Sequence, residues 1–175
     1  MGWGQPTADQ IVTLRSFDAA GHLATETPPG LGTTQYTYLT ASRQTTRTAP
    51  GGESVIETRN PDGSVAAIAG TAVVARYFSY GTEADGRRFT QVNFGSPLSP
   101  RWQKTWIDRL GRAVRSERPG FAGASQPNVV EEQSYDDLTG LLIKTTRTAN
   151  GSPLGAPTFY QYDALGQLTR SGLDC

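Results

Sequence analysis

The chain has 175 residues, enough for one ordinary domain, and its 16 basic and 16 acidic residues give a formal net charge of zero. This balance excludes a global electrostatic field that would draw the protein to nucleic acid or anionic lipid. The 20 Gly and 11 Pro residues, together with frequent Thr, Val and aromatic residues, favour an all-β fold.

A short turn pattern recurs along the chain: a bulky apolar residue, Asp, two residues, Gly, a polar residue and an apolar residue. Copies begin at Phe17, Ile107 and Tyr162, and a copy at Tyr135 has one extra residue before its Gly. The Asp residues of the last three copies are separated by 136−108 = 28 and 163−136 = 27 positions. An Asp that begins a turn can accept backbone N–H groups, and Gly supplies the left-handed position that reverses the chain. The pattern therefore predicts a row of β-hairpins.

A second self-similarity is independent of the Asp pattern. The sequence Thr-Thr-Arg-Thr-Ala occupies both 45–49 and 145–149. When this alignment is extended towards the N-terminus of each copy, Tyr36 pairs with Tyr135. We therefore expect Tyr36 to open a degenerate copy that has lost its Asp.

A different turn signal lies between these copies, at Asn60-Pro61-Asp62-Gly63-Ser64. Looser relatives lie at 50–52, 84–86, 119–120 and 150–151. Asp-Gly and Asn-Gly supply positive φ angles, which two-residue hairpin loops need. We expect the two kinds of turn to alternate, with strand-like stretches at 54–58, 73–78 and 89–94 among the intervening segments.

These signals predict tandem antiparallel β-hairpins that form a curved, open strip. A lead-in segment at 1–15 is expected before hairpin repeats at 16–175, with about seven hairpins of roughly 20 to 28 residues each. The repeat-turn residues are Asp18, Gly21, Asp62, Gly63, Asp108, Gly111, Asp136, Gly140, Asp163 and Gly166. A strip of this length has an unpaired strand at each end, so we expect a piece of a longer array that can self-associate through its sheet edges.

Catalytic machinery is not expected. His22 is the only histidine, and it occupies a polar repeat position that holds Arg112 and Gln167 in other copies. No His/Cys cluster, calcium loop or phosphate loop is present, so neither a metal nor a cofactor is expected. An acidic cluster at 131–132 and 136–137 is more typical of a solvated strand and turn than of a cation site.

Aromatic residues leave one binding alternative open. Trp102 and Trp106 are four residues apart, which places them on one face of a strand. With Tyr77 and Tyr80 they could form a platform on which sugars stack. We favour the alternative that they are bulky wall residues of successive hairpins. Exposure of the cluster would favour ligand binding, and burial between strands would favour a structural role.

The repeats resemble the YD repeat of the RHS family, whose motif is Tyr-Asp-x-x-Gly-Arg-Leu followed by a strand, a Pro-Asp-Gly turn and another strand. The segment 162–168 fits closely, with Gln167 in the Arg place, and 60–63 fits the second turn. The resemblance extends from about Ser16 to Leu173. It departs where Phe17 and Ile107 replace Tyr, where Thr37 replaces Asp and where Thr139 adds a residue.

The resemblance implies a role as well as a fold. Members of the family, among them Tc-toxin components, polymorphic RHS toxins and teneurins, build a hollow shell from a spiralling strip of hairpins. It implies a non-catalytic segment of an encapsulating shell, secreted or at the cell surface, whose partner is the rest of its own polypeptide or an enclosed C-terminal toxin or effector. The chain lacks the segment at which toxin members cleave themselves. The alternative is a carbohydrate-binding or adhesive cell-surface β-module, and neither nucleic-acid binding nor membrane insertion is expected.

Overall fold

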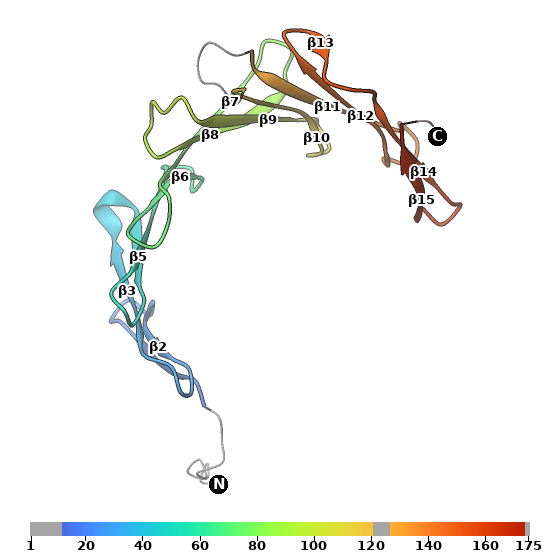
Figure 1. Cartoon of the computed structure of the whole chain (residues 1–175). Helices are drawn as coiled ribbons and strands as arrows, with labels where there is room; N and C mark the ends of the chain where they lie inside the picture. The colour runs from blue at the N-terminus through green and yellow to red at the C-terminus, as the bar shows by residue number, and fades with distance from the viewer. Residues whose placement is uncertain (1–11, 121–126, 174–175) are drawn as a thin grey trace. The chain divides into compact units, whose positions relative to one another are not determined.

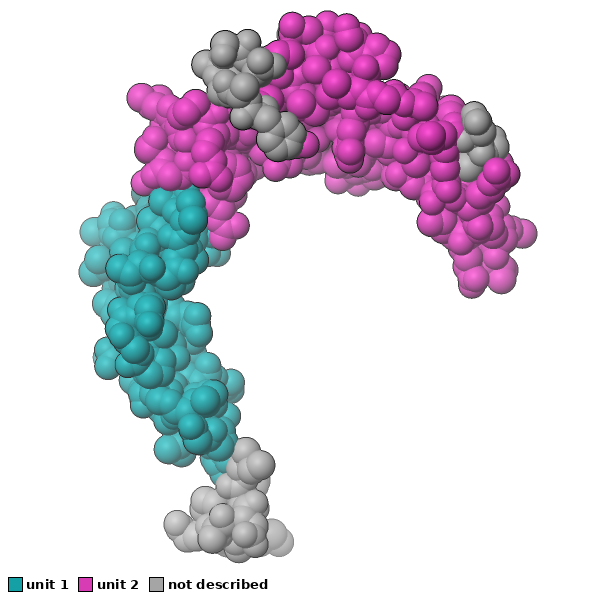
Figure 2. Space-filling model, viewed as in Figure 1, with its two compact units in different colours: residues 1–75 teal, residues 76–175 magenta. Residues whose placement is uncertain are grey.

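The chain forms antiparallel β-strands joined by tight turns (Figure 1). The computed structural model describes residues 12–120 and 127–173, so most of the expected lead-in segment and Cys175 lie outside the described residues. The prediction of an all-β fold is confirmed: the described residues contain strands, one short 3₁₀ turn and no α-helix. No helix in the described part of the chain is long and apolar enough to cross a membrane. The chain divides into two compact units, 1–75 and 76–175 (Figure 2).

Unit 1 is a ladder of strands in chain order. Its strands are β1 Leu14–Phe17, β2 Leu23–Thr27, β3 Thr34–Leu39, β4 Gln44–Thr48, β5 Ser54–Arg59 and β6 Val65–Ala69. Each strand pairs antiparallel with the next one along the chain. The turns within hairpins β1–β2, β3–β4 and β5–β6 therefore lie on one edge of the ladder, and the connections between hairpins lie on the other.

Unit 2 repeats the same arrangement. Its strands are β7 Arg76–Thr82, β8 Arg88–Phe94, β9 Trp102–Ile107, β10 Ala113–Arg118, β11 Val129–Tyr135, β12 Leu142–Ala149, β13 Ser152–Pro153, β14 Thr158–Tyr162 and β15 Leu168–Gly172. Successive strands pair antiparallel, and the short β13 and the following β14 both pair with β12. Its hairpins are β7–β8, β9–β10, β11–β12 and β14–β15. Three hairpins in unit 1 and these four match the predicted number.

Neither unit has a packed interior among its described residues. Among the described residues only Trp106 and Thr34 are buried, with 7% and 8% of their surfaces exposed. The main contacts of each strand are with its neighbours in the ladder. Apolar side chains are thus covered by cross-strand neighbours on the same face rather than by a second layer.

Two turns of the second type, 60–64 and 84–86, lie on the same edge of their unit's sheet as the turns of the Asp pattern, whereas those at 50–52 and 150–151 lie on the other edge. Turns 18–22 and 60–64 lie on the shared edge in unit 1, and turns 83–87, 108–112, 136–141 and 163–167 lie on it in unit 2. We call it the Asp edge. The expectation that the two turn types alternate is therefore wrong for 60–64 and 84–86, because both close the same hairpins that the Asp pattern closes elsewhere.

Both turn types also share one backbone geometry. The N–H of Asp108 donates to the carbonyl of Arg112 over 2.9 Å, and the N–H of Gly111 donates to the carbonyl of Asp108 over 3.1 Å. The turn 60–64 repeats these two bonds at 2.8 and 3.0 Å. Asp62 is not among the residues with positive φ, so the expected two-residue loop at Asp62-Gly63 is wrong. The two-residue geometry occurs instead at Asn150-Gly151, with φ angles of 51° and 75°.

The degenerate copy does not open at Tyr36. Tyr36 pairs with Arg47 inside the β3–β4 ladder, and the chain reverses later, at the 3₁₀ turn η1 Thr40–Ser42. Arg43 follows in the left-handed region, with a φ of 50°. This segment has neither an Asp to accept turn N–H groups nor a Gly for the left-handed position, so a shorter turn closes the hairpin.

The predicted strand at 73–78 begins late. Only residues from Arg76 onwards are strand, as part of β7. Immediately after β6, the hydroxyl of Thr71 accepts the N–H of Ser54 over 2.8 Å, and the N–H of Ala72 donates to the carbonyl of Ser54 over 3.0 Å. These bonds draw the segment across the start of β5, and residues 73–75 lie outside any strand.

We predict that replacing Gly111 by Val lowers the free energy of unfolding by about 1 to 2 kcal/mol. The φ of Gly111 is 81° and a Cβ there would meet no atom within 4 Å, so the cost is backbone strain alone. Urea denaturation measures it. Gly172→Val is the matched control, because Gly172 also has open space but no positive φ. Equal losses for the two variants would contradict the strain explanation.

Candidate functional site

The turn carboxylates organise the Asp edge. Oδ1 of Asp108 accepts the N–H groups of Leu110 and Arg112, both over 2.9 Å. Its Oδ2 accepts Nε of Arg112 over 2.7 Å. The same two backbone positions donate to Asp18 and to Asp163 over 2.8 to 2.9 Å. One side chain thus satisfies the N–H groups that the tight turn leaves without a ladder partner.

A carboxylate at the third turn position performs a related task. Asp62 accepts the N–H of Ser64 over 2.9 Å, and Asp85 accepts that of Arg87 over 3.0 Å. Asp85 also pairs with the Arg87 guanidinium at 2.6 Å. In the copy with an extra residue, Asp136 accepts both the N–H and the hydroxyl of Thr139, over 2.7 and 2.8 Å. The inserted residue is therefore held by the same carboxylate.

These hydrogen bonds favour the ionised carboxylates. The backbone N–H of His22 lowers the pKa of Asp18, and that of Thr139 lowers the pKa of Asp136. The Arg87 side chain lowers the pKa of Asp85. For Asp108, desolvation is the largest influence and raises the pKa, but the hydrogen bonds from Arg112 and Leu110 together bring the pKa below its ordinary value.

We predict that the protein loses stability as the pH falls from about 5 to about 2. A carboxylate with a lowered pKa in the folded state stabilises the fold above its unfolded pKa, which is about 3.9 for Asp, and this contribution disappears as the pH drops through the lowered value. Thermal unfolding across this range measures the effect. Asp108→Asn keeps an accepting oxygen and should show a weaker acid dependence.

The control for this measurement is Asp137→Asn. Asp137 is exposed and, among the described residues, receives no hydrogen bond to its carboxylate. This variant should retain the acid dependence of the unmodified protein. If Asp108→Asn shows the same acid dependence as the unmodified protein, the Asp108 carboxylate is not the cause of the loss of stability.

A tyrosine hydroxyl joins each of three hairpins to the one before it. Tyr38 donates to the carbonyl of Leu23 over 3.1 Å, and Tyr135 donates to that of Ala113 over 2.8 Å. Tyr162 donates to the carbonyl of Leu142 over 2.9 Å. Each accepting residue is the first of its strand, directly after the preceding hairpin's turn. We call these bonds the tyrosine latches. The apolar position of the repeat therefore carries a polar contact that the sequence pattern did not reveal.

The residue at the fifth turn position packs against the latch tyrosine. The Arg112 guanidinium lies 4.5 Å from the ring centroid of Tyr135, and its Nη1 donates to the carbonyl of Gly140 over 3.4 Å. His22 takes the same place beside Tyr38, with ring centroids 4.6 Å apart. His22 also lies 3.1 Å from a carboxylate oxygen of Asp18. The structure thus gives this histidine a place in the hairpin contact.

We predict that Tyr135→Phe lowers the free energy of unfolding by about 0.5 to 1.5 kcal/mol, the usual net contribution of one hydrogen bond. Chemical denaturation measures it. Desolvation raises the pKa of Tyr135, so this latch should persist to alkaline pH and weaken only as the hydroxyl ionises. Tyr77→Phe is the control, because the described residues give the Tyr77 hydroxyl no hydrogen bond. An equal loss in both variants would contradict the latch.

The predicted aromatic platform is not a single surface. Tyr77 pairs with Asn93, which pairs with Trp102, so Tyr77 and Trp102 share a face with Trp106. Tyr80 is three residues after Tyr77 on the regular strand β7 and therefore lies on the opposite face. Trp106 is only 7% exposed. The four residues thus cannot act together as a stacking surface.

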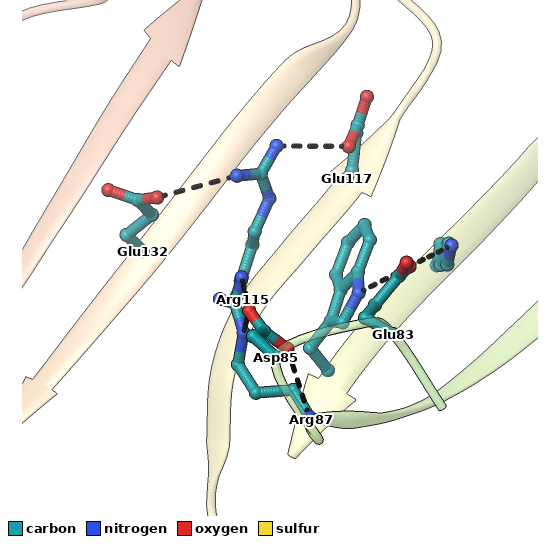
Figure 3. A network of polar contacts seen from close by, with 8 residues as sticks. Glu83, Asp85, Arg87, Arg115, Glu117 and Glu132 are labelled. Carbon is teal, nitrogen blue, oxygen red and sulfur yellow. Dashed lines mark hydrogen bonds and ion pairs between the residues drawn. The ribbon is translucent and has the colours of Figure 1, made fainter. Parts of the chain in front are cut away.

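Trp106 is nearly buried and contacts a network of charged side chains. Figure 3 shows Glu83, Arg115, Glu117 and Glu132 of this network. Oε1 of Glu83 accepts Nζ of Lys104 over 2.7 Å and Nε1 of Trp106 over 3.1 Å. The Lys104 ammonium lies 3.7 Å from the ring centroid of Phe89. Arg115, on β10, lies 5.1 Å from the Trp106 ring.

The acidic residues around this network are already paired. Arg115 contacts Glu117 at 3.2 Å and Glu132 at 3.7 Å. Glu131 pairs instead with Arg147, at 2.6 Å. Within the expected acidic cluster, Glu131 and Glu132 therefore pair with different arginines, whereas Asp136 accepts the N–H of Thr139 in its turn. The described residues contain no group of three or more metal-ligating side chains. An open pocket of about 370 Å³ beside Trp106 is lined by Glu83, Asp85, Arg87 and Arg115, all in ion pairs.

Comparison with models of known protein families finds no match, and a search of curated proteins finds none either.

Proposed function

We propose that the chain is a non-catalytic structural segment of an encapsulating β-shell of the RHS type. Its role is to supply wall area, secreted or at a cell surface, in a longer polypeptide that encloses a C-terminal toxin or effector. Recognition and toxicity then belong to other parts of that polypeptide. The proposal rests on the resemblance of the hairpin repeats to the YD repeat.

The observation that carries the proposal is the use of conspicuous polar and aromatic groups within the hairpin contacts. The hydroxyls of Tyr38, Tyr135 and Tyr162 bind the backbone of the preceding hairpin. The only histidine, His22, packs against Tyr38. The polar atoms and rings of these side chains contact the neighbouring hairpin, as expected of a wall built from repeats.

The adhesive or carbohydrate-binding alternative has weaker support. Its platform needed Trp106 and Tyr80 on one accessible surface, whereas Trp106 is 7% exposed and Tyr80 lies on the other face. Trp102 and Tyr77 share a face, but the ring of Trp106, which would complete the platform, is nearly buried. A glycan array with the full chain tests this alternative directly, and specific binding would place it ahead of the wall proposal.

We predict that the full chain self-associates with increasing concentration, because β1 and β15 each pair on one side only among the described strands. Light scattering across a concentration series measures it. The double variant Leu14→Lys, Leu168→Lys should stay folded and become monomeric, since these edge-strand leucines are 65% and 55% exposed.

The matched control is Leu98→Lys, on the connection between β8 and β9. Leu98 is 95% exposed but lies on no edge strand, so this variant should associate like the unmodified chain. A chain that stays monomeric at every concentration would overturn the wall proposal. Equal effects of the edge and connection variants would assign the association to general surface hydrophobicity.

A further inference from the structure

The Asp edge of unit 1 has one hairpin without a turn carboxylate. Asp18 serves hairpin β1–β2 and Asp62 serves β5–β6. The hairpin between them, β3–β4, is closed by η1 and Arg43, with no acidic residue in the turn. In the described part of unit 1, the β3–β4 turn is therefore the one position of the Asp edge that has an arginine and no carboxylate.

An open pocket lies at that position. It has a volume of about 330 Å³ and receives residues from all three hairpins of unit 1. His22 comes from the first hairpin, Tyr38 and Arg43 from the second, and Arg59 and Asn60 from the third. The lining contains two arginines and no Asp or Glu.

Of the two arginines that line the pocket, Arg43 is the one that does not pair with a carboxylate. Arg59 already pairs with Glu57 at 2.6 Å and donates to the carbonyl of Gly63 over 2.8 Å. Arg43 has no ion pair among the described residues. Elsewhere on the Asp edge, Arg87 pairs with Asp85 and Arg112 pairs with Asp108, in each case the carboxylate of the same turn.

The backbone of Arg43 is also unusual. Its φ of 50° is one of two positive values among the described non-glycine residues, and its carbonyl accepts the N–H of Arg59 over 3.0 Å. A residue with a long side chain in the left-handed region is uncommon and costs free energy, and such conformations cluster at functional positions. The neighbouring hairpin holds this one in place.

We propose that this pocket binds the carboxylate of a ligand, which pairs with Arg43 as Asp85 pairs with Arg87 and Asp108 with Arg112 in other turns. Arg43 is the principal binding residue, because a guanidinium matches a carboxylate with two parallel hydrogen bonds. Arg59 and His22 border the bound group. The carboxylate can belong to a sugar acid or to an acidic residue of another chain, and both present the same chemistry.

The test is an NMR titration of the full chain with D-glucuronate and with N-acetylaspartate amide. Each probe carries one carboxylate, and D-glucuronamide is the uncharged counterpart of the first. We expect a carboxylate probe to shift the amide signals of residues 38–44 with a dissociation constant on the order of 1 to 10 mM. Binding of glucuronate alone identifies a sugar acid, and binding of the aspartate derivative alone identifies an acidic chain.

Two variants isolate Arg43. Arg43→Asn should weaken binding about tenfold while the protein stays folded, because Asn adopts the left-handed region more readily than other non-glycine residues. Arg47→Gln removes an exposed arginine from the same hairpin outside the pocket and should bind like the unmodified chain. The proposal is overturned if neither carboxylate binds, if the amide binds equally well, or if Arg43→Asn and Arg47→Gln have the same effect.

Discussion

Each unit is a single layer of strands that cannot bury its side chains against a second layer of its own, and the rest of this structure depends on that constraint. With only Trp106 and Thr34 buried among the described residues, apolar contact must come from cross-strand neighbours on the same face. Long amphipathic side chains extend this coverage, as Lys104 does over Phe89. Stability therefore accumulates locally, from one strand to the next, and no central core contributes to it.

The contacts between hairpins combine polar and apolar parts for the same reason. A latch tyrosine such as Tyr135 covers its neighbours with its ring and binds a backbone carbonyl with its hydroxyl, so one side chain supplies both area and direction. Arg112 adds a guanidinium above that ring and reaches Gly140 of the same hairpin. In a thin sheet these directional bonds fix how each hairpin sits on the previous one.

The sequence predicts the all-β fold, the turn glycines and the number of hairpins, because the Asp and Gly signals are local and have a direct backbone meaning. The sequence does not predict features that depend on contacts between residues far apart in the chain. The strand expected from Val73 is displaced by the bonds of Thr71 and Ala72 to Ser54. The three-residue spacing of Tyr77 and Tyr80 already places them on opposite faces of a strand, but only the register of β7 decides which of the two shares a face with the tryptophans. The latches were hidden because Tyr at that position looks simply apolar.

One property of the turns bears on how such an array can change over time. A carboxylate at the first position, as in Asp108, and one at the third, as in Asp85, satisfy the same five-residue backbone. A hairpin can therefore exchange one arrangement for the other through point substitutions without moving its strands. The fourth position, where Gly111 and Gly86 have φ angles of 81° and 84°, is the more restricted one. Repeats in a single chain can thus drift apart in sequence, one turn at a time, while their strands stay in register.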